Sequence, residues 1–212
     1  CHGEAPVRRW RVTRHTLTPR RLQFQFGCSL PVAQLRFRRT ITTRRGSSIF
    51  TVREEILNCS RRDLPFTMNE HVTFGPPFLE RGVTLFDMPA TRGLTSPNVF
   101  GPVQRLKVNA GFRWPDGPGN SGQVDLRTLP AKLKHSDFSA QMIDPRRETG
   151  WFSAVNPRQG LMVAYSWKRN DFPWVGNWEE NYIRNAAPWS KKALARGMEF
   201  GNSPFPVGLR AA

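Results

Sequence analysis

Apolar and polar residues alternate along much of the chain, and a period of two is typical of half-buried β-strands. Leu22, Phe24 and Phe26 alternate with polar side chains, and residues 10–13 begin a similar segment. Successive side chains of a strand point to opposite faces of the sheet. The pattern therefore predicts strands with one apolar face turned toward a core and one polar face turned toward water.

Two pairs of these segments are predicted to form β-hairpins, because only a short loop containing glycine separates the two members of each pair. The first pair is residues 37–43 and 49–57, and the second is residues 150–155 and 161–165. A hairpin joins neighbouring antiparallel strands, so both pairs favour an antiparallel sheet.

Helical periodicity is scarce. Only residues 188–198 are compatible with a short turn of helix, and the Pro- and Gly-rich residues 114–122 are predicted to form a long loop. No internal repeat is found, and strand character resumes on both sides of the loop. The chain is therefore predicted to form one all-β domain over residues 1–212.

Charge adds a second feature, because the chain carries a formal net charge of +16. Residues 1–62 hold fourteen arginines and three glutamates, so eleven of the sixteen excess positive charges lie there. Many of these arginines alternate with apolar residues, as in Leu35-Arg36-Phe37-Arg38. We expect a solvated sheet face with weak non-specific polyanion binding, because no zinc-finger spacing, homeodomain helix or aromatic RNA-binding motif accompanies the charge.

Composition also narrows the class of protein. No stretch approaches the roughly 20 apolar residues of a membrane helix, so no membrane association is expected. The three cysteines, Cys1, Cys28 and Cys59, lack metal-ligand spacing and are odd in number. This is typical of free thiols in a reducing compartment, and we expect a cytoplasmic protein. Five of the seven tryptophans follow residue 150, where they could fill a core or line a sugar-binding cleft.

Three ionisable residues are candidates for chemistry. His71 follows an acid and precedes a Phe-Gly-Pro-Pro-Phe run, and His2 and Glu199 have glycine neighbours in settings that resemble loops. His71 could be a core histidine, a metal ligand or a proton-transfer group. Glu199 lies between Met and Phe in the sequence, where desolvation would disfavour its charged form unless donors offset it. A water-facing Glu on a strand edge is the alternative. Without HxH, HExxH or CxxC spacing, we expect no metal and no cofactor.

Four motifs occur in a characteristic order between residues 1 and 206. They are "CHGE" with a Trp shortly after, "MNEHVTFGPPFL", "DFPWVGNWEEN" and "GMEFGNSPFP". In these motifs and their spacing the chain resembles the aldose 1-epimerase (galactose mutarotase-like) superfamily, in particular a divergent bacterial branch. The resemblance implies an antiparallel β-supersandwich. Family members carry further strands before the "HG" motif, so we expect an N-terminal portion to be missing.

The resemblance also implies roles for individual residues. His71 matches the general acid that protonates the sugar ring oxygen, and Glu199 matches the base that takes the anomeric proton. His2 matches a histidine that hydrogen-bonds the sugar, and Asp171 and Trp178 lie where the family has residues of the substrate cleft. The pair would act on opposite sides of a sugar ring held between them, without metal, nucleotide or covalent intermediate.

Three functions are compatible with these features. The first is an aldose 1-epimerase-like isomerase that interconverts the anomers of a monosaccharide by acid/base ring opening and closure. The second is a non-catalytic domain of the same fold that binds a sugar or sugar phosphate. The third, a basic polyanion-binding protein, ranks last because no nucleic-acid-reading motif is present, and no specific nucleic-acid partner is expected.

Overall fold

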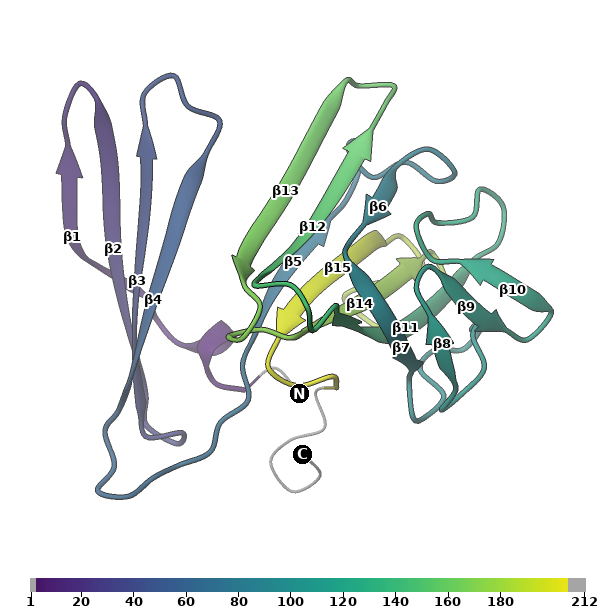
Figure 1. Cartoon of the computed structure of the whole chain (residues 1–212), viewed down its shortest axis with the longest axis horizontal. Helices are drawn as coiled ribbons and strands as arrows, with labels where there is room; N and C mark the ends of the chain where they lie inside the picture. Colours follow the sequence, from purple (N-terminus) through teal and green to yellow (C-terminus); the bar gives the residue numbers. More distant parts are fainter. Residues whose placement is uncertain (1–2, 206–212) are drawn as a thin grey trace. The chain divides into compact units, whose positions relative to one another are not determined.

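The structure, a computed structural model, describes residues 3–205 and is built from antiparallel β-strands (Figure 1). Within these residues the only helical element is one 3-10 turn, η1 (Ala5–Val7). This confirms the all-β prediction. None of the described helical segments is long and apolar enough to cross a membrane.

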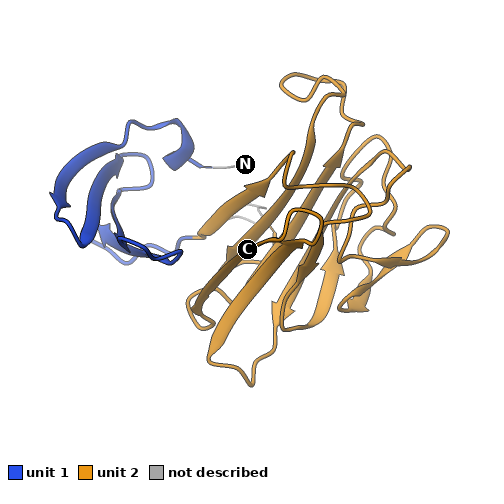
Figure 2. Cartoon of the chain, turned by 90° about the horizontal axis from the view of Figure 1, so that it is seen from above, with its two compact units in different colours: residues 1–66 blue, residues 67–212 orange. Residues whose placement is uncertain are grey.

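The chain forms two compact units, residues 1–66 and residues 67–212 (Figure 2). The alternation of apolar and polar residues predicts strands in both units, and it contains no signal for this division. The single domain expected over residues 1–212 stays a prediction.

The first unit is a four-stranded antiparallel sheet in the order β1-β2-β3-β4. Its strands are β1 (Arg11–Leu17), β2 (Arg21–Leu30), β3 (Leu35–Arg44) and β4 (Phe50–Asn58). The β3–β4 pair confirms the first predicted hairpin.

The alternation separates the two faces of this sheet. On β3, Leu35 and Phe37 are buried while Arg36 and Arg38 are exposed. The prediction that these arginines lie on the solvent side is confirmed for this segment. A sheet with one apolar and one polar face requires this separation.

The second unit contains an eight-stranded and a three-stranded sheet. The eight-stranded sheet has the order β10-β9-β8-β7-β11-β14-β15-β5, and the three-stranded sheet has the order β13-β12-β6. The strands are, in chain order, β5 (Asn69–Phe74), β6 (Leu85–Asp87), β7 (Ala90–Thr95), β8 (Gly111–Arg113), β9 (Asp116–Gly119), β10 (Gly122–Asp125), β11 (His135–Ile143), β12 (Thr149–Asn156), β13 (Leu161–Lys168), β14 (Trp174–Asn181) and β15 (Leu194–Gly201). The β12–β13 pair confirms the second predicted hairpin.

The core of the second unit joins the two sheets. Val175 and Met198 come from the large sheet, and Phe86 and Phe152 come from the small one. All four are fully buried. Burial of large apolar side chains is the main stabilising contribution to such a core.

Tryptophan contributes to this core as well. The ring of Trp167 stacks on Phe200 with 4.3 Å between centroids, and its indole N–H donates to the carbonyl of Phe172. For Trp167 the core interpretation is therefore correct. A buried indole N–H needs such an acceptor.

Two local predictions were wrong. Residues 114–122 do not form a long loop, because they contain β9 and begin β10, which pair as a hairpin. The glycines that suggested a loop instead allow close approach, since a Cβ on Gly119 would lie 2.3 Å from the carbonyl oxygen of Gly122. Residues 188–198 contain turns followed by β15 and no helix, because Met198 and Phe200 alternate with residues of the other face.

Candidate functional site

His71 and Glu199 lie directly opposite each other on neighbouring strands. His71 is on β5, the edge strand of the eight-stranded sheet, and Glu199 is on β15, which lies between β5 and β14. Residues opposite each other in an antiparallel pair point to the same face. The His71 Nε2 and Glu199 Oε1 atoms are 2.9 Å apart, which is hydrogen-bonding distance.

The environment of Glu199 differs from the one expected from its sequence neighbours. Met198 and Phe200 are both buried in the core on the opposite face of β15. They do not enclose the carboxylate, because adjacent residues of a strand point to opposite sides. Glu199 also lies in a central strand of the sheet, and not in a loop or on an edge.

Polar groups of β5 make further contacts with this pair. The Asn69 side-chain amide donates to Glu199 Oε2 at 3.4 Å, and the Thr73 hydroxyl lies 3.0 Å from His71 Nδ1. Both imidazole nitrogens therefore have a partner. Such contacts restrict the orientation of the ring and leave Nε2 directed at the carboxylate.

Trp178 on β14 borders the pair. Its ring meets the imidazole of His71 edge to face, with centroids 5.9 Å apart. We call the side of the sheet that carries His71, Glu199 and Trp178 the His71 face. The aromatic ring of Phe138, opposite Trp178 on β11, continues this face but is covered by Phe100 and Phe205.

Glycines form the floor around Glu199. Gly197 and Gly201 flank it at two residues' distance on β15, and Gly176 lies opposite it on β14. A Cβ on Gly197 would approach Glu199 Oε1 and His71 Cε1 to 3.1 Å. The absence of side chains at these positions makes room for the pair.

The ion pair changes the titration of the histidine. The hydrogen bond from His71 to Glu199 and the negative charge of that carboxylate raise the pKa of His71 above 6.5, although burial acts in the opposite direction. A raised pKa increases the protonated fraction of the imidazole at any given pH near neutrality. The pair thus combines a proton donor and a carboxylate acceptor. His71 is 30% exposed and Glu199 10%, so a ligand can reach the imidazole from solvent.

The structure brings together three of the five predicted site residues. His71, Glu199 and Trp178 share one face, whereas Asp171 lies in an exposed turn between β13 and β14. Within residues 3–205, no hydrogen bond or ion pair joins the Asp171 side chain to the other three. His2 lies outside the described residues. The roles of all five stay predictions.

Several residues of the site were missed by sequence reasoning. In a strand, residues two positions apart share a face. Alternation would therefore place Asn69 and Thr73 on the same face as His71, and Gly197 and Gly201 on the same face as Glu199. A strand assignment for both motifs would have found them. Gly176 could not be found in this way, because only the β14–β15 register places it beside Glu199.

A second ionisable cluster is buried on the face of the large sheet opposite the His71 face. Oxygen and nitrogen atoms of His135, Asp137 and Glu179 lie within 4.8 Å of one another, as metal ligands do. However, Arg105 donates to both carboxylates, and Arg196 Nη1 lies 3.5 Å from Glu179. Two guanidinium groups thus already neutralise the two acids, and a cation would have to displace Arg105. We interpret this cluster as a structural ion-pair network.

The buried charges shift the titration of this network. Burial alone would raise the pKa of Glu179, but the charge of Arg105 and the hydrogen bond from His135 hold it well below 4.5. Desolvation lowers the pKa of Arg196 to about 10. Both side chains therefore remain ionised at neutral pH.

Comparison with known proteins supports the fold and leaves the activity open. No known protein family matches the chain, and a search of curated proteins finds no relative. Among solved structures, the chain is similar to the crystal structure of a "putative aldose 1-epimerase from Klebsiella pneumoniae subsp. pneumoniae MGH 78578". The TM-score is 0.63 at 14% sequence identity, over 89% of this chain and 44% of the Klebsiella chain.

The similarity has two consequences. The chain spans less than half the length of the Klebsiella protein, and at 14% identity the likeness concerns the fold alone. The resemblance inferred from the four motifs is confirmed at this level. This chain has a galactose mutarotase-like antiparallel β fold.

Proposed function

We propose that the His71 face binds a sugar and interconverts its anomers by acid/base ring opening and closure. The observation that carries the proposal is the hydrogen-bonded contact between His71 and Glu199 beside Trp178. A proton donor and a proton acceptor are the two groups that opening a hemiacetal requires. The mutarotase-like fold supports sugar as the substrate class.

The distance within the pair changes the expected geometry. At 2.9 Å, no sugar ring fits between the His71 imidazole and the Glu199 carboxylate. The reacting oxygens O1 and O5 of a hemiacetal are both bonded to C1, so they lie close together. A donor and an acceptor in contact can address these two oxygens from one side after a small separation.

The proton transfers then follow. Glu199 removes the proton from O1 while protonated His71 gives its proton to O5, so that the C1–O5 bond breaks and C1=O1 forms. Rotation about C1–C2 and the reverse transfers close the ring on the other face. Each positioned acid or base contributes roughly 10²–10⁴-fold. The step balances, because Glu199 gains the proton that O1 loses, O5 gains the proton that His71 loses, and the pair changes from two opposite charges to two neutral groups.

Trp178 supplies the apolar part of the site. The faces of tryptophan rings suit the C–H faces of pyranoses, and one end of a sugar ring on Trp178 would lie beside His71. Asn69 and Thr73 offer polar groups next to the pair for sugar hydroxyls.

Exchange spectroscopy or polarimetry with several aldoses tests the proposal. The wild type should accelerate anomer interconversion above buffer, and His71→Ala and Glu199→Gln should each lower the rate by roughly 10²-fold or more. Glu148→Gln is the matched control, because Glu148 is exposed and remote in sequence from the site. Equal rates in the control and both site variants would refute the assignment.

A non-catalytic sugar-binding domain is the second candidate, because no sugar ring fits between His71 and Glu199 at their 2.9 Å separation. A pair that remains closed would offer hydrogen bonds without proton transfer. Calorimetry separates the two functions. Saturable sugar binding that Trp178→Ala abolishes, with no rate above buffer, would assign binding alone.

A further inference from the structure

The polar face of the first unit has a distinct composition. Register places one set of side chains from β1–β4 on the face opposite the apolar one, and we call it the arginine face. It carries Arg11, Arg14, Arg21, Arg36, Arg38, Arg44 and Arg53, with Glu55 as the acidic residue of these strands on this side. The remaining polar side chains are mostly Gln, Thr and Ser. This face therefore has a large positive charge.

A hollow of about 870 Å³ lies on this face above Gly27. Gly27 is in register with Arg11 on one side and Arg38 on the other. It has no side chain of its own there, and the methyl group of Thr13 lies over it. The side chains that line the hollow include Arg8, Arg9, Arg11, Arg36 and Arg38 with Glu55.

The positive charge of this hollow is mostly uncompensated. Arg8 pairs with Glu4 at 2.6 Å, and Arg38 lies 3.5 Å from Glu55. Among the described residues, Arg9, Arg11 and Arg36 have no acidic partner. Guanidinium groups held near one another without a counter-charge favour the binding of an anion.

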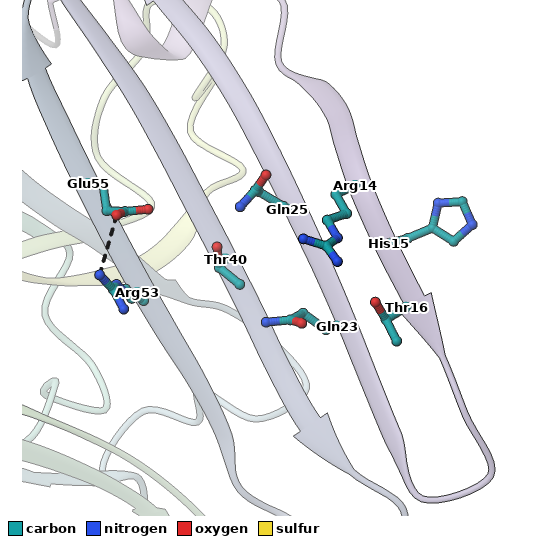
Figure 3. Close-up of a pocket in the computed structure, with 8 residues that line it drawn as sticks. All are labelled: Arg14, His15, Thr16, Gln23, Gln25, Thr40, Arg53 and Glu55. Atoms are coloured by element: carbon teal, nitrogen blue, oxygen red, sulfur yellow. Dashed lines mark hydrogen bonds and ion pairs between the residues drawn. The ribbon is translucent and has the colours of Figure 1, made fainter.

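A second, smaller hollow extends the surface. It measures about 240 Å³ and is lined by Arg14 and Arg53 together with Gln23, Gln25 and Thr40 (Figure 3). It shares Gln25 and Glu55 with the larger hollow, so the two form one continuous surface across the four strands.

We propose that the arginine face binds an acidic polysaccharide, a linear sugar polymer with repeating carboxylate or sulfate groups. Guanidinium groups form paired hydrogen bonds with both kinds of anion, and the Gln and Thr side chains between them match sugar hydroxyls. Two adjacent hollows fit a repeating ligand better than a single small anion. This surface lies in the first unit, and the inference is independent of the function proposed for the His71 face.

The faces of the sheet distinguish this partner from nucleic acid. Binding of single strands depends on aromatic rings that stack with bases. On β1–β4 the rings of Phe24, Phe26, Phe37 and Phe50 all belong to the apolar face. Figure 3 also shows His15 directed away from the other labelled side chains, and its ring stacks near Phe24. The arginine face thus offers charge and hydrogen bonds without stacking.

Binding is measured with the full chain, by fluorescence anisotropy of labelled polymers at several salt concentrations. The probes are polygalacturonate for carboxylate, dextran sulfate for sulfate, neutral dextran, and single- and double-stranded DNA. We expect saturable, salt-sensitive binding of an acidic polysaccharide and none of neutral dextran. Binding of polygalacturonate alone would assign carboxylate, and binding of dextran sulfate alone would assign sulfate.

Variants test whether the arginine face is responsible. Arg11→Gln combined with Arg36→Gln should weaken binding by about tenfold or more, because each removes charge-assisted hydrogen bonds. Arg113→Gln combined with Arg147→Gln removes the same charge from exposed positions of the second unit and should change it by less than about twofold. Arg→Lys at positions 11 and 36 should give an intermediate affinity, because the charge remains and the paired geometry is lost.

Three results would overturn the inference. These are no binding of either acidic polymer, equal weakening by the two pairs of variants, and tighter binding of DNA than of both polysaccharides at the same salt concentration. Circular dichroism of each variant checks that the sheet is retained. His71→Ala should bind the polymer like the wild type, so this result is independent of sugar isomerisation.

Discussion

At the scale of single residues, the proposed site of the second unit depends on one contact between an imidazole and a carboxylate. His71 and Glu199 are 128 positions apart in the chain, yet Nε2 and Oε1 are at hydrogen-bonding distance. The carboxylate raises the pKa of His71, and the imidazole in turn holds the carboxylate in place. Each residue thus sets the protonation or position of the other, and a change in one affects both.

Glu199→Gln should lower the pKa of His71 toward 6.5, because it removes the negative charge and replaces the carboxylate acceptor with a weaker, neutral amide. Titration of the His71 Cε1–H signal by nuclear magnetic resonance measures the change. Glu148→Gln should leave the curve unaltered. An unchanged His71 pKa in Glu199→Gln would show that the two side chains do not interact in solution.

The same shift predicts the sign of a stability effect. A raised folded-state pKa means that protonated His71 stabilises the fold, fully below pH 6.5 and progressively less as pH rises through the raised value. The difference in unfolding free energy between wild type and Glu199→Gln should therefore diminish as pH rises through that range.

At the scale of elements, the two faces of β15 have different roles. Met198 and Phe200 face the core, while Gly197, Glu199 and Gly201 face the site. Because successive side chains of a strand point to opposite faces, the residues that pack in the core are not the ones that line the site. The small residues are required on the site side, because a Cβ on Gly201 would lie 2.8 Å from the Cβ of Asn69.

Gly197→Ala tests the role of this floor. Its Cβ would meet Glu199 Oε1, His71 Cε1 and the Trp178 ring at 3.1 to 3.3 Å, so the pair must shift by a few tenths of an ångström. We expect the proposed anomerisation rate to fall roughly tenfold to a hundredfold, because proton transfer depends on positioning.

Gly111→Ala is the matched control for this change. It also lies on a strand of the large sheet, but its added methyl group would meet no atom within 4 Å. Its rate should equal that of the wild type. A Gly197→Ala protein as active as this control would show that the floor does not constrain the pair.

At the scale of the whole second unit, the large sheet holds the proposed site on one face and the core on the other. Besides apolar residues, the interior of this unit contains the buried ion-pair network of Arg105, His135, Asp137, Glu179 and Arg196. Arg196 illustrates how such a charge is accommodated. It donates to the carbonyl of Leu126 at 2.6 Å and covers the ring of Phe86.

Glu179→Gln should destabilise the second unit by about 3–5 kcal/mol, because it leaves Arg105 and Arg196 buried with less compensating charge. Arg146→Gln at an exposed ion pair should cost less than about 1 kcal/mol. Urea denaturation followed by tryptophan fluorescence measures both.

Because the pKa of Glu179 is lowered, its contribution to the free energy of unfolding is present above pH 4.5 and lost as pH falls through the lowered value. Equal stability of the two variants would contradict a structural role for the network.

Much of the fold could be predicted from local patterns. The hairpins β3–β4 and β12–β13 each join neighbouring segments, so alternation and a glycine-containing loop sufficed to predict them. Residues 114–122 were misjudged because their prolines and glycines are typical of loops, although they also suit a short hairpin at the far edge of the sheet. The short turn of helix with which residues 188–198 are compatible does not form, because β15 begins within that range.

The sequence by itself determined that this protein is built from antiparallel strands, and which side chains share a face within each strand. It also indicated His71, Glu199 and Trp178 as candidates. Only the tertiary structure decided that the three meet, that Asp171 does not join them and that Glu199 is surrounded by glycines. The reason is physical. Alternation is a property of one strand, whereas the order β14-β15-β5 and its register follow from burying both sheets against a common core.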